Sequence, residues 1–211
     1  MLNIGLCSLL NMCASMGNWE KHPGEEPKRL HRSRGQWTAE DLDALRADVP
    51  YRTEIVDGNL IVNPRPNPWH NDVIRVMTNA LVAALPPALW AFFETEIRWI
   101  DEEGIRHSLV PDVMVAPKRL RDERTPFAAA ADVALVVEVE SRSTRKIDRT
   151  FKPRLYADLG ISDMWRVESD LTLVKYRLTP EGGPEIVQKV TGGTFVTEDP
   201  FPVSIDLDAL R

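Results

Sequence analysis

Two short apolar runs in the middle of the chain, each interrupted by carboxylates, constrain the fold more than any other feature. The first is VPDVMVA over residues 110–116, and the second is VALVVEVE over residues 133–140. Both are rich in β-branched residues and bounded by polar segments, which predicts two buried strands. Because alternate residues of a strand face the same side, Glu138 and Glu140 should share one side of the sheet. A buried carboxylate there is costly unless cations or hydrogen-bond donors compensate it.

The rest of the pattern predicts a mixed α/β fold with helices flanking a central sheet. Apolar residues with a 3.6-residue period predict helices, and short β-branched or aromatic runs predict strands. Proline and glycine residues mark most of the boundaries. The predicted elements are a short helix capped by Thr38, a hairpin over 53–62, a helix over 70–85, a strand over 91–100, a helix over 151–159, and strands over 163–167 and 171–178.

The length of 211 residues suits one domain, predicted over 37–211, after an N-terminal extension over 1–36 that we expect to be flexible. The first 17 residues resemble a signal peptide but lack its basic start, so an extension is the favoured interpretation. Both cysteines, Cys7 and Cys13, lie there. The Cys-free remainder suits a reducing cytoplasm, and no apolar run is long enough for a membrane-spanning helix.

The charge is unevenly distributed along the chain. The net charge of -6, from 26 basic and 32 acidic residues, argues at first against a nucleic-acid partner. However, segment 94–103 holds five acids and one arginine, whereas segment 141–154 holds six basic residues and one acid. The positive charge thus follows the second acidic strand directly. Any affinity for nucleic acid is therefore expected to be weak and sensitive to salt.

Lys152 stands out within this basic segment. A cation near a helix start is disfavoured by the helix dipole, and Pro153 should bias Lys152 away from helical geometry. A lysine placed there is expected to face an anion such as a phosphate. A solvated loop with an ordinary Asp148–Lys152 pair at helical spacing is the alternative. Likewise, the acids could lie solvated at strand ends or pair with nearby arginines.

Taken together, the sequence resembles the putative restriction endonuclease family of the PD-(D/E)XK nuclease superfamily, from about Trp37 to the C-terminus. It departs from the family pattern at Thr53, where an aromatic residue is usual, at Arg142, where proline is common, and at Met164, which replaces a tyrosine. The motifs that carry the resemblance are Glu54 with Asp57-Gly58, His70 at the first long helix, Pro111-Asp112, Glu138-Val139-x-Ser141, Asp148-x-x-x-Lys152, Tyr156-Ala157, Gly160-Ile161 with Trp165, and FPVSIDL over 201–207.

The resemblance implies an α/β fold with a restriction-endonuclease-like mixed β-sheet flanked by helices. It implies that Asp112 and Glu138 bind Mg2+ or Mn2+, and that Lys152 acts from the following helix because Glu140 holds the superfamily's usual lysine position. Glu54 would be a further catalytic acid. The supporting residues would be His70, Glu140, Ser141 and Asp148. The residues that contact the nucleic-acid backbone would be Arg142, Arg145, Lys146 and Arg149.

The expected function is therefore a metal-dependent endonuclease that hydrolyses phosphodiester bonds of DNA. A non-catalytic nucleic-acid-binding or interaction module with the same fold is the alternative. A zinc hydrolase using His70 and His107 is a third hypothesis, although no H-x-x-x-H spacing supports it. A nuclease with one active site per chain usually needs two copies to cut both DNA strands, which suggests a homodimer. The substrate structure and recognition sequence stay open.

Overall fold

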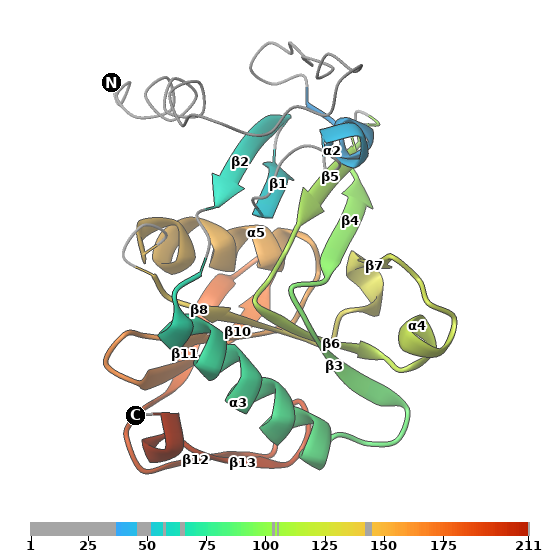
Figure 1. The fold of residues 1–211 in the computed structure, drawn as a ribbon. Helices are drawn as coiled ribbons and strands as arrows, with labels where there is room; N and C mark the ends of the chain where they lie inside the picture. Colours follow the sequence, from blue (N-terminus) through green and yellow to red (C-terminus); the bar gives the residue numbers. More distant parts are fainter. Residues whose placement is uncertain are drawn as a thin grey trace, which may run out of the picture. The chain divides into compact units, whose positions relative to one another are not determined.

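Figure 1 shows the computed structural model of the chain. The structure describes residues 37–45, 52–56, 58–63, 66–102, 104, 106–141 and 145–210. The predicted extension over 1–36 and the predicted DNA contact Arg142 lie outside these residues. Among the described residues, no helix is both long and apolar enough to cross a bilayer.

The helices and strands alternate along the chain. The helices are α2 (Ala39–Leu45), α3 (Pro68–Ala84), α4 (Arg119–Asp122) and α5 (Lys152–Asp158), with a π-helical turn over Ile147–Phe151 and 3-10 turns over Ala130–Asp132 and Asp208–Leu210. The strands are β1 (Arg52–Val56), β2 (Asn59–Asn63), β3 (Leu89–Phe93), β4 (Glu96–Ile100), β5 (Arg106–Leu109), β6 (Val113–Pro117), β7 (Phe127–Ala129), β8 (Leu135–Val139), β9 (Asp163–Val167), β10 (Thr172–Thr179), β11 (Gly183–Thr191), β12 (Thr194–Thr197) and β13 (Val203–Asp206).

A six-stranded mixed sheet of order β11-β10-β9-β8-β6-β3 forms the centre of the fold. Its strands pair antiparallel except for β8 and β9, which run parallel and are joined through α5. Helix α3 lies against one face of this sheet and α5 against the other (Figure 1). The alternation of β6 explains why both faces are apolar, since Val113 and Val115 join the core under α3 while Met114 and Ala116 join the core under α5.

A second sheet, of order β2-β1-β5-β4-β7, holds the hairpin predicted over 53–62. Arg52 and Glu54 lie two residues apart on β1 and so face the same side of this sheet. The last two strands, β12 and β13, form a separate antiparallel pair near α3. The second sheet matters for function because it places polar side chains of β1 above the end of the central sheet.

Two local predictions were wrong. The strand predicted over 91–100 is two strands in different sheets, because Glu94 takes a left-handed conformation with φ of 44° and turns the chain between them. Lys152 is helical, with φ of -58° and ψ of -42°, although it precedes Pro153. A π-helical turn precedes Pro153. In it the backbone N–H of Lys152 donates to the carbonyl of Ile147, five residues earlier, so this turn is wider than an α-helical turn and accommodates a proline ring that has no N–H.

Candidate active site

The acids of the two apolar runs meet across neighbouring strands. Strands β6 and β8 pair with Val113 opposite Val137, and one step further along this register Asp112 lies across from Glu138. Asp112 occupies the bend before β6, and Glu138 lies within β8. Both residues are only 1% exposed. The alternation of the strands directs both carboxylates to the α5 side, where they converge.

Lys152 and Tyr156 approach Glu138 from one face of the α5 segment. The Lys152 amine donates to Glu138 Oε1 at 2.8 Å, and the Tyr156 hydroxyl donates to the same oxygen at 2.6 Å. Asp148, one helical turn earlier, places Oδ1 3.6 Å from the same amine. No described residue donates a hydrogen bond to the second carboxylate oxygen, Glu138 Oε2. The helix thus fixes one oxygen of Glu138 and leaves the other for a further partner.

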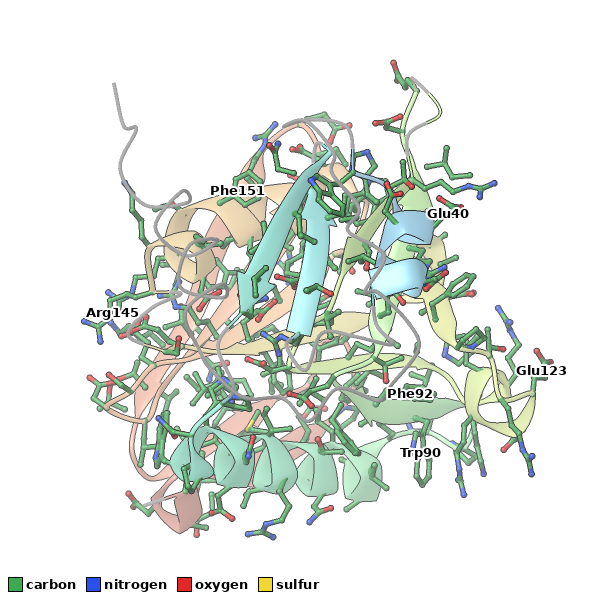
Figure 2. All side chains as sticks on the ribbon, turned by 45° about the horizontal axis from the view of Figure 1, so that its top comes forward. Glu40, Trp90, Phe92, Glu123, Arg145 and Phe151 are labelled. Atoms are coloured by element: carbon green, nitrogen blue, oxygen red, sulfur yellow. The ribbon has the colours of Figure 1, made fainter. Side chains whose placement is uncertain are left out.

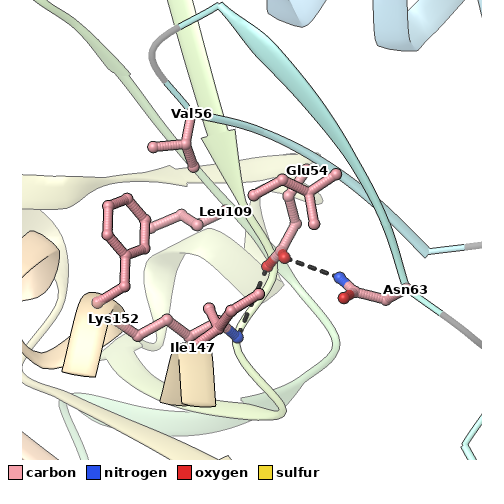
Figure 3. Close-up of a pocket in the computed structure, with 8 residues that line it drawn as sticks. Glu54, Val56, Asn63, Leu109, Ile147 and Lys152 are labelled. Atoms are coloured by element: carbon pink, nitrogen blue, oxygen red, sulfur yellow. Dashed lines mark hydrogen bonds and ion pairs between the residues drawn. The ribbon is translucent and has the colours of Figure 1, made fainter. Parts of the chain in front are cut away.

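Glu54 adds a buried acid from the second sheet. Its Oε1 accepts the Val110 backbone N–H at 2.9 Å, and its Oε2 accepts the Asn63 amide at 2.7 Å. The Lys152 amine lies 3.9 Å from Glu54 Oε1, as the dashed line in Figure 3 shows. Lys152 therefore connects Glu54 to Glu138, and the two sheets contribute to one polar cluster.

Asp112 is held by three donors. Arg52 Nη1 donates to Oδ1 at 2.5 Å, while the Val139 backbone N–H donates to Oδ2 at 2.7 Å. His70 Nε2 lies 3.3 Å from Oδ2 and 3.0 Å from the Val139 carbonyl oxygen. Asn67 caps α3 by accepting the His70 backbone N–H, which fixes the histidine at the start of this helix. The structure therefore places His70 beside Asp112, where it orients the carboxylate.

Burial and pairing move the pKa values of the two acids in opposite directions. Burial alone would raise the pKa of Asp112, but its hydrogen bond with His70 and the neighbouring positive charges hold that pKa well below its usual range. Burial dominates at Glu138, where Lys152 only partly offsets it, and the neighbouring carboxylates add to it, so the pKa rises to about 8. Although burial lowers the pKa of Lys152, its attraction to Glu138 raises it above the usual value, so the amine stays charged.

The cluster gathers four buried acids around two basic side chains. Each acid is 1% exposed, and Arg52 and Lys152 contact members of this group. The four acids are Glu54, Asp112, Glu138 and Asp148. The raised pKa of Glu138 shows that burial and the neighbouring acids disfavour its charged form, a cost that a proton or a further cation would relieve.

Two buried acids, Asp112 and Glu138, are the residues that could hold a metal ion. Mg2+ is usually held by one or two carboxylates and keeps several waters, so such a pair could suffice for it. In the described part of the chain, no group of three or more His, Cys, Asp or Glu side chains is placed to hold a metal ion of any kind. His107 pairs with Asp101 and stacks on Trp99, away from the partners of His70. The structure thus gives the zinc hypothesis no support.

Glu140 organises the basic residues that follow β8. It is fully buried, and the Nε atoms of Arg145 and Arg149 donate to its two oxygens at 2.6 and 2.5 Å. Arg145 also donates its backbone N–H to the carbonyl of Ser141, which starts the helical segment. Lys146 is exposed, and Arg145 lies at one edge of the molecule in Figure 2. These cations form a surface beside the cluster, with two of them anchored by one acid.

A small pocket opens beside Lys152 and Glu54. Its walls are mostly apolar, and its empty space is about 280 Å³ with the opening to solvent included (Figure 3). The lining residues besides these two are Val56, Ile61, Asn63, Leu109, Ile147 and Phe151. Lys152 and Glu54 thus form the charged part of an otherwise mostly apolar pocket wall.

Sequence reasoning gave no role in the site to three polar partners, although Tyr156 was among the family motifs. Arg52 shares a strand face with Glu54, and Tyr156 follows Lys152 by one helical turn, so period-two and period-four spacing could have pointed to both. No spacing in the sequence pointed to Asn63, because its hydrogen bond with Glu54 depends on the register in which β1 and β2 pair.

Comparisons with known proteins bear on the family and the fold of the chain. The family model Uma2, described as putative restriction endonuclease, matches residues 39–209. A solved structure from Anabaena variabilis ATCC 29413, described as a putative nuclease, is 20% identical over 75% of this chain and 90% of its own, with a TM-score of 0.56. This match confirms the predicted restriction-endonuclease-like α/β fold. No curated protein matches the chain.

Proposed function

Because this chain belongs to the Uma2 family of putative restriction endonucleases, we propose that it is a metal-dependent endonuclease that hydrolyses phosphodiester bonds of DNA. The observation that carries the proposal is the convergence of Asp112, Glu138 and Lys152 in one buried cluster. Burial and the neighbouring acids make ionisation of Glu138 costly, and a bound cation would offset this cost. The family and this group of buried acids together support a nuclease site.

Asp112 and Glu138 would hold Mg2+ or Mn2+, the oxygens concerned being Asp112 Oδ1 and Glu138 Oε2. When bound, the ion polarises the scissile phosphate and makes water a better nucleophile at neutral pH. The side chains themselves orient these carboxylates: Tyr156 and Lys152 fix Glu138, and His70 with the Val139 N–H fixes Asp112.

Lys152 would stabilise negative charge on the phosphate. Its raised pKa keeps the amine protonated, so it serves as a hydrogen-bond donor rather than as a base. Glu54 lies 3.9 Å from the same amine and helps to hold it at the pocket. Asp148, at 3.6 Å, limits its movement from the other side. Lys152 is thus preorganised for an anion that enters from solvent.

The basic surface formed by Arg145, Lys146 and Arg149 would contact the DNA backbone. Such contacts position the nucleic acid without reading its sequence. Because Glu140 already pairs with both arginines, each keeps only part of its guanidinium for phosphate. The proposal therefore includes modest, salt-dependent affinity for DNA.

One observation favours the alternative of a non-catalytic binding module. Asp112 and Glu138 each already contact a protein cation, Arg52 at 2.5 Å and Lys152 at 2.8 Å. Such pairs can be purely structural. Calorimetric titration with Mn2+ separates the two functions. A module without a working site should show no Mn2+ binding that is lost when Asp112 or Glu138 is replaced.

The test of the nuclease proposal is cleavage of supercoiled plasmid and labelled oligonucleotides with Mg2+, Mn2+ or EDTA. We expect cleavage only with the ions, and a loss on the order of a thousandfold in Asp112→Asn and Lys152→Ala. Asp72→Asn, at an exposed ion pair with Arg75 on α3, is the matched control and should retain activity. Circular dichroism checks that each variant is folded. Undiminished cleavage by either folded site variant would overturn the assignment.

The same assay addresses the substrate and the assembly. Double-stranded, single-stranded and RNA oligonucleotides show which nucleic acid is cut. Analytical ultracentrifugation with and without duplex DNA shows whether two copies assemble, as cutting both strands from one site per chain would require.

A further inference from the structure

Arg52 occupies the Asp112 oxygen that the proposed function gives to a metal ion. Its Nη1 atom donates to Asp112 Oδ1 at 2.5 Å, and no other described residue donates to that oxygen. The opposite oxygen, Oδ2, is fixed by the Val139 N–H at 2.7 Å and by His70 at 3.3 Å. Any ion that approaches Oδ1 therefore meets Arg52 first.

A guanidinium and a divalent ion disfavour each other at this oxygen. Mg2+ binds oxygen ligands at about 2.0–2.1 Å and carries its own waters, which need the space around the ligand. Two cations that share one carboxylate in a buried site also repel each other strongly. Binding of the ion should therefore displace the arginine, and the arginine should lower the affinity for the ion.

The position of Arg52 lets it leave the carboxylate towards solvent. Its side chain is 18% exposed, whereas that of Asp112 is 1% exposed. Arg52 also interacts with the buried acids Glu54 and Glu138. On the solvent side it lies 3.9 Å from Glu94, whose side chain is 40% exposed, and its buried Nε atom has no hydrogen-bond partner among the described residues. Arg52 thus lies between the buried acids and the surface.

We propose that Arg52 is an exchangeable counter-ion, which holds Asp112 in the metal-free protein, releases it to a divalent ion, and then binds a phosphate oxygen of the DNA. The inference rests on the proposed function, to which both the ion and the phosphate belong. Guanidinium suits both roles, because its planar array of donors pairs with carboxylates and phosphates alike.

The exchange couples metal binding to DNA binding. The ion frees a donor for phosphate, and a phosphate that engages Arg52 uncovers Asp112 for the ion. Because coupling between two ligands is reciprocal, each should raise the affinity of the other by the same factor. Replacing Arg52 should reduce this factor even where both ligands still bind.

The first experiment measures Mn2+ affinity by calorimetry in the wild type, Arg52→Met and Arg98→Met. Arg98 is the matched control, since it is also a strand arginine, its side chain is 19% exposed, and it pairs with Asp43 and Glu96 instead. We expect the Kd for Mn2+ to fall about fivefold or more in Arg52→Met, as for a typical coupling, and to be unchanged in Arg98→Met. An unchanged or higher Kd in Arg52→Met overturns the proposal.

The second experiment measures DNA affinity by fluorescence anisotropy with Ca2+ or EDTA, so that no cleavage is needed. Ca2+ should strengthen binding of a duplex by about tenfold in the wild type and in Arg98→Met. In Arg52→Met this factor should fall severalfold, because the donor released by the ion is missing. An equal factor in all three proteins overturns the coupling.

Two further measurements separate this inference from the proposed function. If Asp112→Asn binds Mn2+ as well as the wild type, the metal site is wrong and both proposals fail. If Mn2+ binding is lost in Asp112→Asn but unchanged in Arg52→Met, only the counter-ion role fails. Should Arg52→Met not fold, the Nε–H NMR signal of Arg52 in the wild type, identified with Arg52→Lys, should shift on saturation with Mg2+. An unchanged signal overturns the proposal.

Discussion

Glu138 and Glu140 stand two residues apart at the end of the same strand, yet the first lies among buried acids and the second among arginines. The group around Glu138 contains three further buried acids and two basic residues, namely Glu54, Asp112, Asp148, Arg52 and Lys152. Around Glu140, the carboxylates of Glu140 and Glu168 face three arginines. The three arginines are Arg145, Arg149 and Arg166.

This difference separates two tasks that neighbouring acids can perform. An acid with too few cations around it suits an incoming cation, whereas an acid outnumbered by arginines positions them for an incoming anion. A metal-dependent nuclease needs both, because it binds an ion and a phosphate side by side. We therefore assign the Glu138 cluster to the ion and the Glu140 cluster to the DNA backbone.

The strongest test of this division exchanges each acid for its amide. Glu138→Gln should abolish Mn2+ binding in calorimetry and lower single-turnover cleavage on the order of a thousandfold. Glu140→Gln should keep Mn2+ binding, because Glu140 pairs with Arg145 and Arg149 and is not a proposed ligand of the ion. Equal loss of Mn2+ binding in both variants would show that the two clusters form one site.

Two buried tyrosines give a smaller effect that separates the clusters by stability. Tyr156 donates to Glu138, and Tyr176 is paired with Arg166. Tyr156→Phe should lower the free energy of unfolding by about 1.5–3 kcal/mol, as for a hydrogen bond to a charged group. Tyr176→Phe should cost about 1 kcal/mol or less, because Arg166 keeps Glu168 as a partner. Urea denaturation measures both, and the reverse order would contradict the comparison.

The arginines of the Glu140 cluster should determine the salt dependence of DNA binding. Each arginine that contacts phosphate adds about one to the slope of log K against log salt. The double variant Arg145→Ala and Arg149→Ala should therefore reduce this slope by up to about two and weaken binding by about tenfold at moderate salt. Arg75→Ala, at an exposed pair on α3, is the control. A slope unchanged from the wild type would remove these arginines from the DNA contact.

The sequence was most informative where local periodicity decides the structure. The β-branched runs predicted β6 and β8. Strand alternation predicted only that Glu138 and Glu140 share a side, whereas the position of Asp112 across from Glu138 depends on how β6 pairs with β8. The anion expected beside Lys152 is in this structure a carboxylate, Glu138. These features follow from spacings of two and four residues, which sequence displays directly.

The sequence was least informative where contacts depend on how the two sheets meet. Arg52 and Asp112 are 60 residues apart, and only the placement of β1 over the central sheet brings them together. The end of β3 before Glu94 was also not predictable from the sequence, because no glycine or proline marks the left-handed conformation of this residue. The helical Lys152 depended on a π-helical turn that no single-residue preference predicts.

The smallest effect we expect is stabilisation by the metal ion itself. An ion that binds only the folded protein adds about 1.4 kcal/mol at ten times its Kd, which should raise the Tm by about 3–6 °C for a chain of this size. Scanning calorimetry with Mg2+ and with EDTA should show this rise in the wild type and in Glu140→Gln, which keeps both proposed ligands, Asp112 and Glu138. Glu138→Gln should show little of it, because one of these ligands is gone. A rise of the same size in Glu138→Gln would mean that the ion stabilises the fold somewhere other than at the buried cluster.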